Sequence, residues 1–347
     1  MNRKRVAVAL SGGVDSSVAA FLLLQGGYEV AGFHMRLWCS PRLDYQARRA
    51  KNICCILKIP YHEVDLHKEF ESRVVEYFVE EYKRGRTPNP CVACNKHIKF
   101  SLLLDKAFSL GYEYLATGHY ARVEESNNRY QLFEAEDLNR DQSYFLYTLT
   151  QERLKFVLFP LGKYTREQVR EIAKKAGLPL AARSSQDLCF ISEKNYRIFL
   201  QERISSSPGD IVDVSGKKLG EHQGIAFYTI GQRHGLGIAL GKPLYVIRIE
   251  PEYNRIVVGS EEELYSDRLT VENVNWIKGE APLCPIALKV KVRYKSKGAE
   301  AVVFPEDDSA HVCFSQAQKA VTPGQVAVFY QGSEVIGGGI IAEVGKC

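Results

Sequence analysis

The sequence lacks any apolar run long enough to cross a bilayer, which excludes a protein built on membrane-spanning helices. Its start, Met1 to Arg5, is basic like a secretion signal, but the apolar stretch behind it breaks at Ser11, so the hydrophobic core of a signal is missing. Internal repeats and low-complexity tracts are absent as well. These absences predict a globular protein of the cytoplasm that has no membrane partner.

The nine cysteines lack the pattern of a disulfide framework, because their number is odd and their spacing irregular. Most of them are expected to be small buried hydrophobes. The net charge of +5 permits a polyanionic partner without requiring one. At 347 residues the chain exceeds what one hydrophobic core supports, so two or three domains are expected.

The first half of the chain alternates short β-rich runs with helical patterns. Strands are predicted at 6–10, 29–35, 61–64 and 114–117, and helices at 18–24, 44–57, 70–82 and 100–110. This alternation predicts an α/β fold, a parallel sheet with helices on both faces. Such sheets bind ligands beyond the carboxyl ends of their strands, where Ser11 and Gly118 fall.

The second half changes character beyond about residue 200. Before it, Thr165 and Gln168 predict a helix that begins with a capping box. A linker at 205–209 then leads to short alternating runs separated by turn residues. These runs predict two compact β modules, at 212–265 and at 269–344.

The segment from Ser11 to Ser17, between a predicted strand and a predicted helix, is a candidate phosphate loop. Its glycines let the backbone approach a ligand, and its N–H groups suit anionic oxygens. Asp15 is placed to hold a Mg²⁺. The plain alternative is a glycine-rich turn with a serine cap. The segment is no Walker A or GxGxxG loop, but it resembles the pyrophosphatase loop of the N-type ATP pyrophosphatases, which split ATP into AMP and pyrophosphate.

Cys91 and Cys94 follow two prolines and precede a helix that is predicted to start near Lys99. A cysteine close to a helix start and to lysines ionises more readily, and the thiolate is the nucleophile. Half a zinc site, a redox pair and a nucleophile with a neighbour all stay open, although no second ligand pair for zinc follows. Cys189 is a third candidate, for which a buried core cysteine is the plain alternative.

Seven ordered motifs, spread over nearly the whole chain, resemble those of the bacterial tRNA-specific 2-thiouridylases. They are the glycine loop, Thr87-Pro88-Asn89-Pro90 with Cys94-Asn95, Thr117-Gly118-His119-Tyr120-Ala121, Asp141-Gln142-Ser143-Tyr144-Phe145-Leu146, Ser185-Gln186-Asp187-Leu188-Cys189-Phe190-Ile191, Thr229-Ile230-Gly231-Gln232-Arg233 and Thr322-Pro323-Gly324-Gln325. The resemblance implies an ATP-pyrophosphatase domain of the adenine-nucleotide alpha-hydrolase type at 1–200. It further implies a small central β-rich module at 201–266 and a tRNA-binding C-terminal β-barrel at 267–347.

The resemblance also implies roles for single residues. Cys94 would be the nucleophile, Cys189 would carry a persulfide, the two would form a disulfide during turnover, and Asp15 would complete the catalytic set. The residues implied to bind ATP are Ala9, Leu10, Ser11, Gly12, Gly13, Val14, Asp15, Ser16, Ser17, Met35 and Gly118. Those implied to contact tRNA are Asn89, Pro90, Cys91, His119, Arg140, Asp141, Gln142, Arg293, Tyr294 and Gln325.

The implied reaction transfers AMP from ATP to O2 of a tRNA uridine, with Mg²⁺ on the phosphates, and then places sulfur on C2. Either a Cys189 persulfide delivers its terminal sulfur while Cys94 breaks the S–S bond, or Cys94 releases hydrosulfide. The resemblance points to the wobble uridine in the anticodon arm. A cysteine desulfurase or a sulfur-relay protein would supply the sulfur.

One position departs from the family pattern. Many members have Asp where this chain has Cys91, which puts an acid–base role of that position in doubt. Two interpretations stay open. Cys91 is passive, or Cys91, Cys94 and Cys189 together ligate a [4Fe-4S] cluster.

The segment 288–297 alternates basic and apolar residues strictly. As a strand it would place five basic side chains on one face, a row that suits a phosphate backbone. A solvated edge strand protected by lysine is the alternative. Tyr120 and Tyr144 are candidates either to stack on anticodon bases or to be core residues.

Two other functions remain possible at this point. A small-molecule ligase of the argininosuccinate synthetase type would use the loop, but it has no use for paired thiols. A non-enzymatic RNA- or metal-binding protein with an inactive loop would bind tRNA without releasing AMP.

Overall fold

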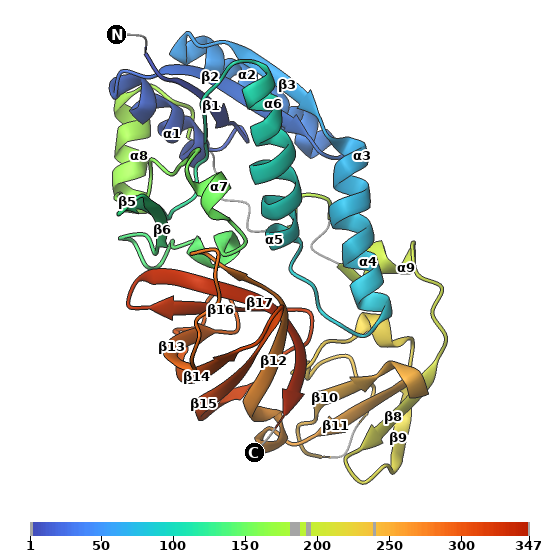
Figure 1. Cartoon of the computed structure of the whole chain (residues 1–347). Helices are drawn as coiled ribbons and strands as arrows, with labels where there is room; N and C mark the ends of the chain where they lie inside the picture. Colours follow the sequence, from blue (N-terminus) through green and yellow to red (C-terminus); the bar gives the residue numbers. More distant parts are fainter. Residues whose placement is uncertain (1–2, 181–187, 192–195, 239–240, 346–347) are drawn as a thin grey trace.

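Three β-sheets organise the structure, a computed structural model that describes residues 3–180, 188–191, 196–238 and 241–345 (Figure 1). The Ser185-Gln186-Asp187 part of the last cysteine motif lies outside the described residues. Within the described ranges, no helix is long and apolar enough to cross a membrane.

The first sheet is parallel and has β1 (Arg5–Ala9) in its centre. On one side of β1 lie β2 (Glu29–Arg36) and β3 (Tyr61–Asp65), and on the other lie β4 (Tyr114–Ala116) and β7 (Val157–Leu158). All neighbouring strands are parallel. The strand order therefore reverses between β1 and β4, the point at which such sheets bind ligands.

Both faces of this sheet are covered, so β1 is buried from its second residue, Val6, to its end. Val6 and Val8 belong to one hydrophobic core and Ala7 and Ala9 to another, as the period of two along a strand requires. The helices of the first face are α1 (Val14–Gln25), α2 (Pro41–Leu57) and α8 (Arg166–Lys175). The capping box predicted for α8 is present.

Two long helical rods cover the second face. One joins α3 (His67–Phe70), the π-helical η1 (Glu71–Val75) and α4 (Glu76–Lys83). The other joins α5 (Pro90–Cys94), the π-helical η2 (Asn95–Leu103) and α6 (Leu104–Ser109). Two short helices follow later in the chain, α7 (Gln151–Leu154) and α9 (Tyr196–Gln201).

The helix of the paired cysteines begins earlier than the sequence predicts. It starts at Pro90 rather than near Lys99, so Cys91 and Cys94 lie inside its first turns. The side chain of Asn89 caps this helix by accepting a backbone N–H at 3.3 Å, and proline suits the first helical position because it has no N–H to satisfy. The prediction was wrong because it treated the two prolines only as a stiff approach to the helix.

The central module is a sheet in the order β10-β11-β8-β9. Its strands are β8 (Gly209–Asp213), β9 (Lys218–His222), β10 (Tyr245–Glu250) and β11 (Arg255–Gly259). The fully buried His222 holds its turns together: Nδ1 accepts the N–H of Gly224 at 3.0 Å, so Nε2 carries the proton and donates to the carbonyl of Asn254 at 3.0 Å. Burial lowers the pKa of His222, which keeps this tautomer neutral.

The C-terminal sheet closes into a barrel, because β12 pairs with β15 on one side and with β17 on the other. Its strands are β12 (Tyr265–Trp276), β13 (Ile286–Lys291), β14 (Ala299–Pro305), β15 (Ser309–Lys319), β16 (Val326–Gln331) and β17 (Glu334–Gly345). A parallel sheet with helices, a central module and a C-terminal barrel confirm the predicted fold class. The exact domain limits stay a prediction.

A hairpin that the sequence reading overlooked joins the barrel to the first part of the chain. It consists of β5 (Arg122–Ser126) and β6 (Arg129–Phe133), and β6 pairs with β17. Its turn residues Asn127 and Asn128 both have positive φ, as the favoured two-residue hairpin turn requires. The hairpin links the barrel to the domain that carries the parallel sheet.

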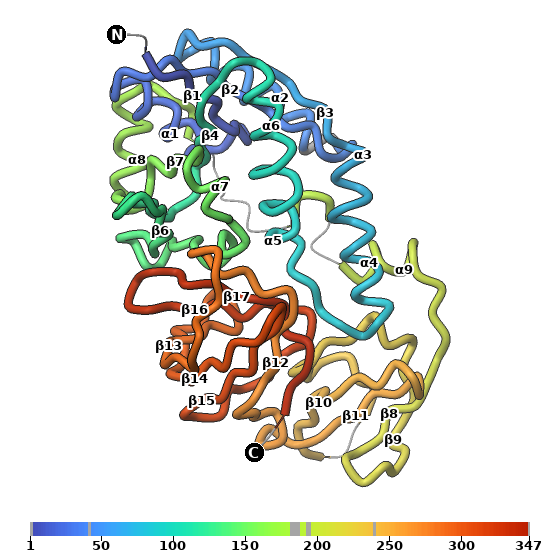
Figure 2. The backbone as a smooth tube through the Cα atoms, in the orientation of Figure 1, coloured from blue at the N-terminus to red at the C-terminus, as the bar shows by residue number. Residues whose placement is uncertain are grey.

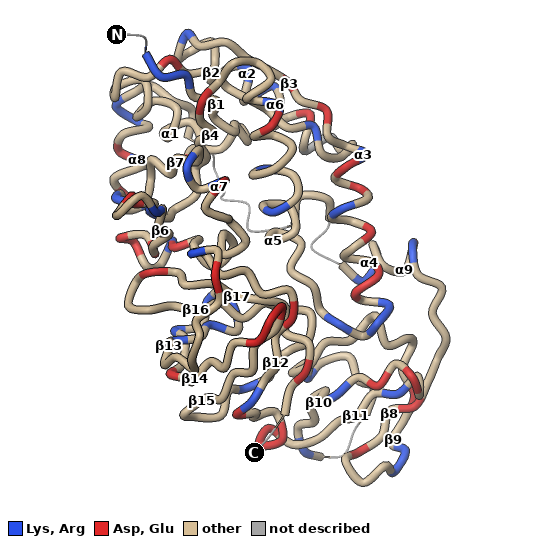
Figure 3. Tube along the Cα trace, in the orientation of Figure 1, with Lys and Arg blue, Asp and Glu red and all other residues tan. Residues whose placement is uncertain are grey.

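The basic segment at 288–297 is only partly the predicted row of cations. Its strand β13 ends at Lys291 and lies between β14 and β16, so it is no edge strand. Lys291 is mostly buried and its ammonium is 2.5 Å from the carboxylate of Glu134. Along the trace in Figure 3, basic and acidic positions are spread over all three parts of the chain.

Candidate active site

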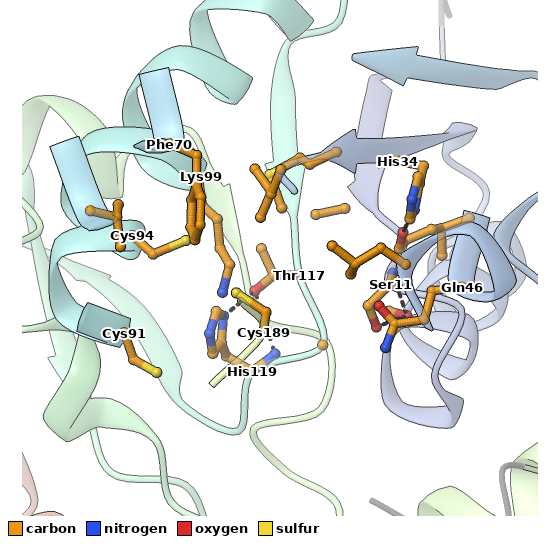
Figure 4. A pocket seen from close by; sticks show the side chains of 18 of the residues that line it. Ser11, His34, Gln46, Phe70, Cys91, Cys94, Lys99, Thr117, His119 and Cys189 are labelled. Atoms are coloured by element: carbon orange, nitrogen blue, oxygen red, sulfur yellow. Dashed lines mark hydrogen bonds between the residues drawn. The ribbon is translucent and has the colours of Figure 1, made fainter. Parts of the chain in front are cut away.

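A cavity of about 360 Å³ lies beyond the carboxyl ends of β1, β2 and β4 (Figure 4). The predicted nucleotide residues that line it are Ala9, Leu10, Ser11, Asp15, Ser16, Met35 and Gly118. Its other end is lined by Cys91, Cys94 and Cys189 together with Lys99 and His119. One continuous space therefore joins the candidate phosphate loop to all three candidate thiols.

The phosphate loop is shaped by its own serines. The hydroxyl of Ser16 accepts the N–H of Ser11 at 3.3 Å, and the hydroxyl of Ser17 donates to the carbonyl of Gly13 at 2.7 Å. Gly12 has a φ of +74°, and a Cβ there would lie 2.6 Å from the carbonyl oxygen of Gln46 in α2. Glycine is therefore required at this position by conformation and by space.

The other predicted loop residues lie in or behind this turn. Gly13 is the N-cap of α1, and Val14 is its first residue. Ser17 is fully buried, so its hydroxyl supports the loop from behind. The first N–H groups of α1 have no partner within the helix and carry the positive end of its dipole, which suits an anionic ligand.

Gly118 brings the end of β4 against the start of α1. A Cβ at Gly118 would lie 2.7 Å from the backbone nitrogen of Ser16 and 2.8 Å from the carbonyl carbon of Asp15. The carboxylate of Asp15 accepts the hydroxyl of Tyr120 at 3.1 Å, and burial raises the pKa of Asp15. One carboxylate beside an anion-binding loop fits a Mg²⁺ that takes its remaining ligands from phosphate oxygens and water.

The three thiols come from two segments that are far apart in the chain. Cys91 and Cys94 lie in α5, near its first and at its last residue, and Cys189 lies in the short described stretch 188–191. All three are free; the side chain of Cys94 is buried, while those of Cys91 and Cys189 line the cavity and keep some exposed surface there. Leu188 and Cys189 line the same cavity. The next residue, Phe190, holds this stretch in place, because its ring packs on those of Phe70 and Phe78 with centroids 5.8 and 5.3 Å away, respectively.

The pKa values of all three thiols are raised, contrary to the expectation from the helix start and the lysines. Burial raises the pKa of Cys94 to about 11 and that of Cys189 to about 12, although the ammonium of Lys99 acts in the opposite direction on both. Burial also raises the pKa of Cys91. The loss of hydration therefore outweighs the nearby cation.

Lys99 is a site residue that the sequence reading missed. Its ammonium donates to the side chain of Asn95 at 3.0 Å and acts electrostatically on all three thiols. In the π-helical η2, hydrogen bonds connect residues five positions apart, so Cys94 and Lys99 share a side of the rod. A lysine five positions after a candidate nucleophile was the signal available in the sequence.

Two histidines complete the cavity wall. His119 was predicted to contact tRNA, and here its Nδ1 lies 2.7 Å from the hydroxyl of Thr117, while burial holds its pKa well below the usual value. His34, which was missed, donates from Nδ1 to the carbonyl of Leu10 at 2.8 Å. A histidine in the otherwise apolar stretch 30–35 of β2 was the available signal for it.

The predicted iron–sulfur ligands do not form a metal site in this arrangement. Among the described residues, no group of three or more His, Cys, Asp or Glu side chains is placed to hold a metal ion. The three thiols share a cavity without converging on one point.

The comparisons with known proteins cover nearly the whole length of the chain. Three family models match in order: "tRNA methyl transferase HUP domain" at 4–193, "tRNA methyl transferase PRC-barrel domain" at 197–260 and "Aminomethyltransferase beta-barrel domain" at 266–341. The tRNA-specific 2-thiouridylase MnmA of Acetivibrio thermocellus is 46% identical over 98% of this chain and 100% of its own. The protein of that name from Carboxydothermus hydrogenoformans is 47% identical over 98% of each chain.

The chain belongs to the tRNA-specific 2-thiouridylase family. This membership confirms the resemblance seen in the motifs. It does not favour a small-molecule ligase. A solved structure, the U34-tRNA thiolase NcsA of Methanococcus maripaludis with its [4Fe-4S] cluster, is 21% identical with a TM-score of 0.37, over 55% of this chain and 61% of that one. A likeness this low assigns no cluster to this member of the family.

Several residues that the 2-thiouridylase resemblance assigns to tRNA make contacts within the protein. The buried carboxylate of Asp141 accepts two backbone N–H groups and the hydroxyl of Ser143. The side chain of Gln142 lines the cavity and accepts the N–H of Tyr120 at 3.0 Å. Arg140 is half-buried in the preceding turn. Their roles towards tRNA stay predictions.

Arg293 and Tyr294 lie just after β13. Arg293 donates to the carbonyls of Lys319 and Ala320, the latter at 3.1 Å. The half-buried ring of Tyr294 packs on Phe145 with centroids 4.4 Å apart. Tyr120 and Tyr144, the two candidates for base stacking, are both buried.

The remaining predicted tRNA residues surround the entry of the cysteine helix. Pro90 and Cys91 line the cavity, and Asn89 is the helix cap. Gln325 reaches the same region from the barrel, where its amide donates to the carbonyl of Thr87 at 2.9 Å. The structure thus brings these four predicted residues together.

Proposed function

We propose that this chain replaces the C2 oxygen of a tRNA uridine with sulfur at the expense of ATP. The observation that carries the proposal is the single cavity that holds an anion-binding loop at one end and three thiols at the other. A small-molecule ligase has no use for the second end. The names of the full-length relatives support the same reaction.

The first half of the reaction makes the C2 oxygen a leaving group. Uracil C2 belongs to a weakly electrophilic carbonyl, and oxide does not leave, so O2 attacks the α-phosphorus of ATP and pyrophosphate departs. The N–H groups at Ser11–Ser16 are suited to the phosphate oxygens, and Asp15 would hold the Mg²⁺ that offsets their charge. The nucleotide would fill the end of the cavity lined by Met35 and Gly118.

The second half transfers sulfur. The terminal sulfur of a Cys189 persulfide attacks C2 and AMP leaves. The Cys94 thiolate then attacks Sγ of Cys189, which releases the thiocarbonyl and forms a Cys94–Cys189 disulfide. The transferred sulfur is reduced and the two cysteines are oxidised, so an external thiol reductant must restore them. A persulfide supplied by a cysteine desulfurase or a relay protein would reload Cys189.

The cavity offers groups for these proton and charge changes. Lys99 stabilises an anionic sulfur because its ammonium faces the thiols. Burial holds the pKa of His119 well below its usual value, so its neutral ring lines the cavity without adding a positive charge. The raised pKa values of Cys94 and Cys189 favour the protonated thiols between turnovers.

The substrate would be the wobble uridine, presented from the anticodon arm in the cytoplasm. A single-stranded loop can splay its bases into a cavity of this kind, whereas a paired base cannot reach it. The exposed basic residues that remain on the barrel would bind phosphates, so tRNA affinity should fall as salt rises.

The test is mass spectrometry of nucleosides from unmodified tRNA incubated without oxygen with the protein, Mg-ATP and a persulfide or sulfide source. Cys94→Ser and Cys189→Ser are run beside the wild type, with Cys284→Ser as the matched control, because Cys284 is exposed and outside the cavity. With the persulfide source, wild type and Cys284→Ser should form 2-thiouridine, and the two site variants should not.

The outcomes separate the alternatives. Rescue of Cys189→Ser by free sulfide would favour its role as persulfide carrier. Wild type that forms no thiouridine with any donor, yet consumes ATP with a small-molecule substrate, would refute the proposed function and favour a ligase.

A further inference from the structure

The segment 86–89, here called the strap, connects α4 to α5 and runs beside the central module and the barrel (Figure 2). Its backbone groups form hydrogen bonds with one turn of the barrel, at residues 323–325. The N–H of Thr87 donates to the carbonyl of Pro323 at 2.9 Å. The side-chain amide of Gln325 donates to the carbonyls of Thr87 and Pro88 at 2.9 and 3.2 Å. Three polar groups of the strap are thus satisfied from the barrel.

The side chains of the strap are held from three directions. Arg86 lies 2.8 Å from the carboxylate of Glu81 in α4 and 2.7 Å from that of Glu272 in β12. The hydroxyl of Thr87 donates to that of Thr229, in the central module, at 3.3 Å. The catalytic domain, the central module and the barrel therefore meet at the strap.

Glycines on both sides let the strap approach its neighbours closely. A Cβ at Gly324 would lie 2.8 Å from the backbone nitrogen of Thr87, and Gly324 has a φ of +89°. On the other side, a Cβ at Gly85 would lie 2.6 Å from the side chain of Ile249 in β10. With so little space, a shift of the barrel turn must move the strap.

The strap ends at the cap of the cysteine helix. Asn89 caps α5, so the position of the strap sets where the helix begins and where Cys94 lies relative to the phosphate loop. We propose that Gln325 is a positioning residue that holds the strap, and through it Cys94, for sulfur transfer. This inference rests on the proposed function. It differs from the tRNA contact predicted for Gln325, because it places the residue's effect on the chemical step.

The chemistry of the side chain explains why glutamine is suitable. Two carbonyl oxygens need two donors, and the amide group of glutamine supplies both from one nitrogen. Glutamate would present only acceptors to these carbonyls, and asparagine is one methylene shorter. Methionine keeps the length and volume of glutamine without either donor.

The experiment compares Gln325→Met with Gln316→Met, because Gln316 is an exposed glutamine of the same barrel. Two quantities are measured on the full chain: the Kd for tRNA, and the single-turnover rate of 2-thiouridine formation at saturating tRNA and ATP. Gln325→Met should keep the Kd and lose on the order of 100-fold in the saturated rate, since a displacement of about 1 Å has an effect of that size. Gln316→Met should match the wild type in both.

A saturated rate equal to that of wild type would overturn the inference, whatever happens to the Kd. A raised Kd with an unchanged saturated rate would instead support a tRNA contact. If Gln325→Met does not fold, Thr229→Val removes the bond on the opposite side of the strap, and an unchanged saturated rate of that variant overturns the inference equally. Wild type that forms no thiouridine at all refutes the proposed function rather than this inference.

Discussion

Gly118→Ala should lower the affinity for ATP and leave the affinity for tRNA unchanged. The backbone of Gly118 has an ordinary φ, so alanine adds no conformational strain there. Its Cβ, however, would lie 2.7 Å from the nitrogen of Ser16 and 2.8 Å from the carbonyl carbon of Asp15. Because both neighbours are backbone atoms, they cannot rotate away, and the start of α1 must move.

The size of the effect follows from the cost of overpacking. Inserting a methyl group into a closely packed site costs about 1–3 kcal/mol. Here that cost is relieved by displacing the loop that would bind the phosphates, so ATP affinity should fall about 5- to 150-fold. Affinity for tRNA should stay the same, because the loop lies at the end of the cavity away from the strap.

The assay measures ATP binding by calorimetry and tRNA binding by filter retention for Gly118→Ala and for Gly220→Ala. Gly220 is a matched control because it also has an ordinary φ, but its Cβ would lie 3.5 Å from the flexible side chain of Ile238, an ordinary contact. Equal ATP affinity of Gly118→Ala, Gly220→Ala and wild type would show that the reasoning is wrong.

Two further predictions concern the modules beyond the cavity. Burial lowers the pKa of His222 in the native state, so below pH 6.5 the unfolded chain binds a proton on this side chain more readily than the native chain does. The free energy of unfolding should therefore fall by up to about 1.4 kcal/mol for each pH unit as the pH is lowered. In His222→Gln the urea midpoint of unfolding should depend less on pH between 7.5 and 5.5 than it does in wild type. An unchanged pH dependence would contradict the role of the hydrogen bond from Gly224. Lys291→Met should lower stability, because it leaves Glu134 unpaired, and it should have little effect on tRNA binding. Lys289 is exposed, so Lys289→Met should instead reduce the salt dependence of tRNA binding by about one counterion. Equal salt slopes for the two lysine variants would refute this distinction.

The local architecture was readable from the sequence because its determinants are neighbours in the chain. The strand, glycine loop and helix around Ser11 predict an anion site, and the box at Thr165 predicts the start of α8, and the structure has both elements. The alternation of strands and helices likewise gave the parallel sheet. The start of the cysteine helix was misplaced, even though Asn89 and Pro90 carry the information for a cap and a first turn.

Other features depend on which surfaces meet, and no local pattern encodes that. From the sequence, Cys94 and Cys189 were separate candidates, and only the family resemblance paired them. The fold places both in one cavity with Lys99. The alternating pattern of 288–297 predicted Lys291 as one of a row of free cations, yet Glu134, which is distant in the chain, forms an ion pair with it.

What the sequence by itself determined is therefore the fold class, the phosphate loop, the set of thiols and, through its motifs, the family. Only the tertiary structure decided that the pKa values of Cys94 and Cys189 are raised rather than lowered, because desolvation depends on everything packed around a group. It alone also decided that Gln325 holds the strap, since a hydrogen bond between residues so far apart in the chain exists only once the barrel has docked on the catalytic domain.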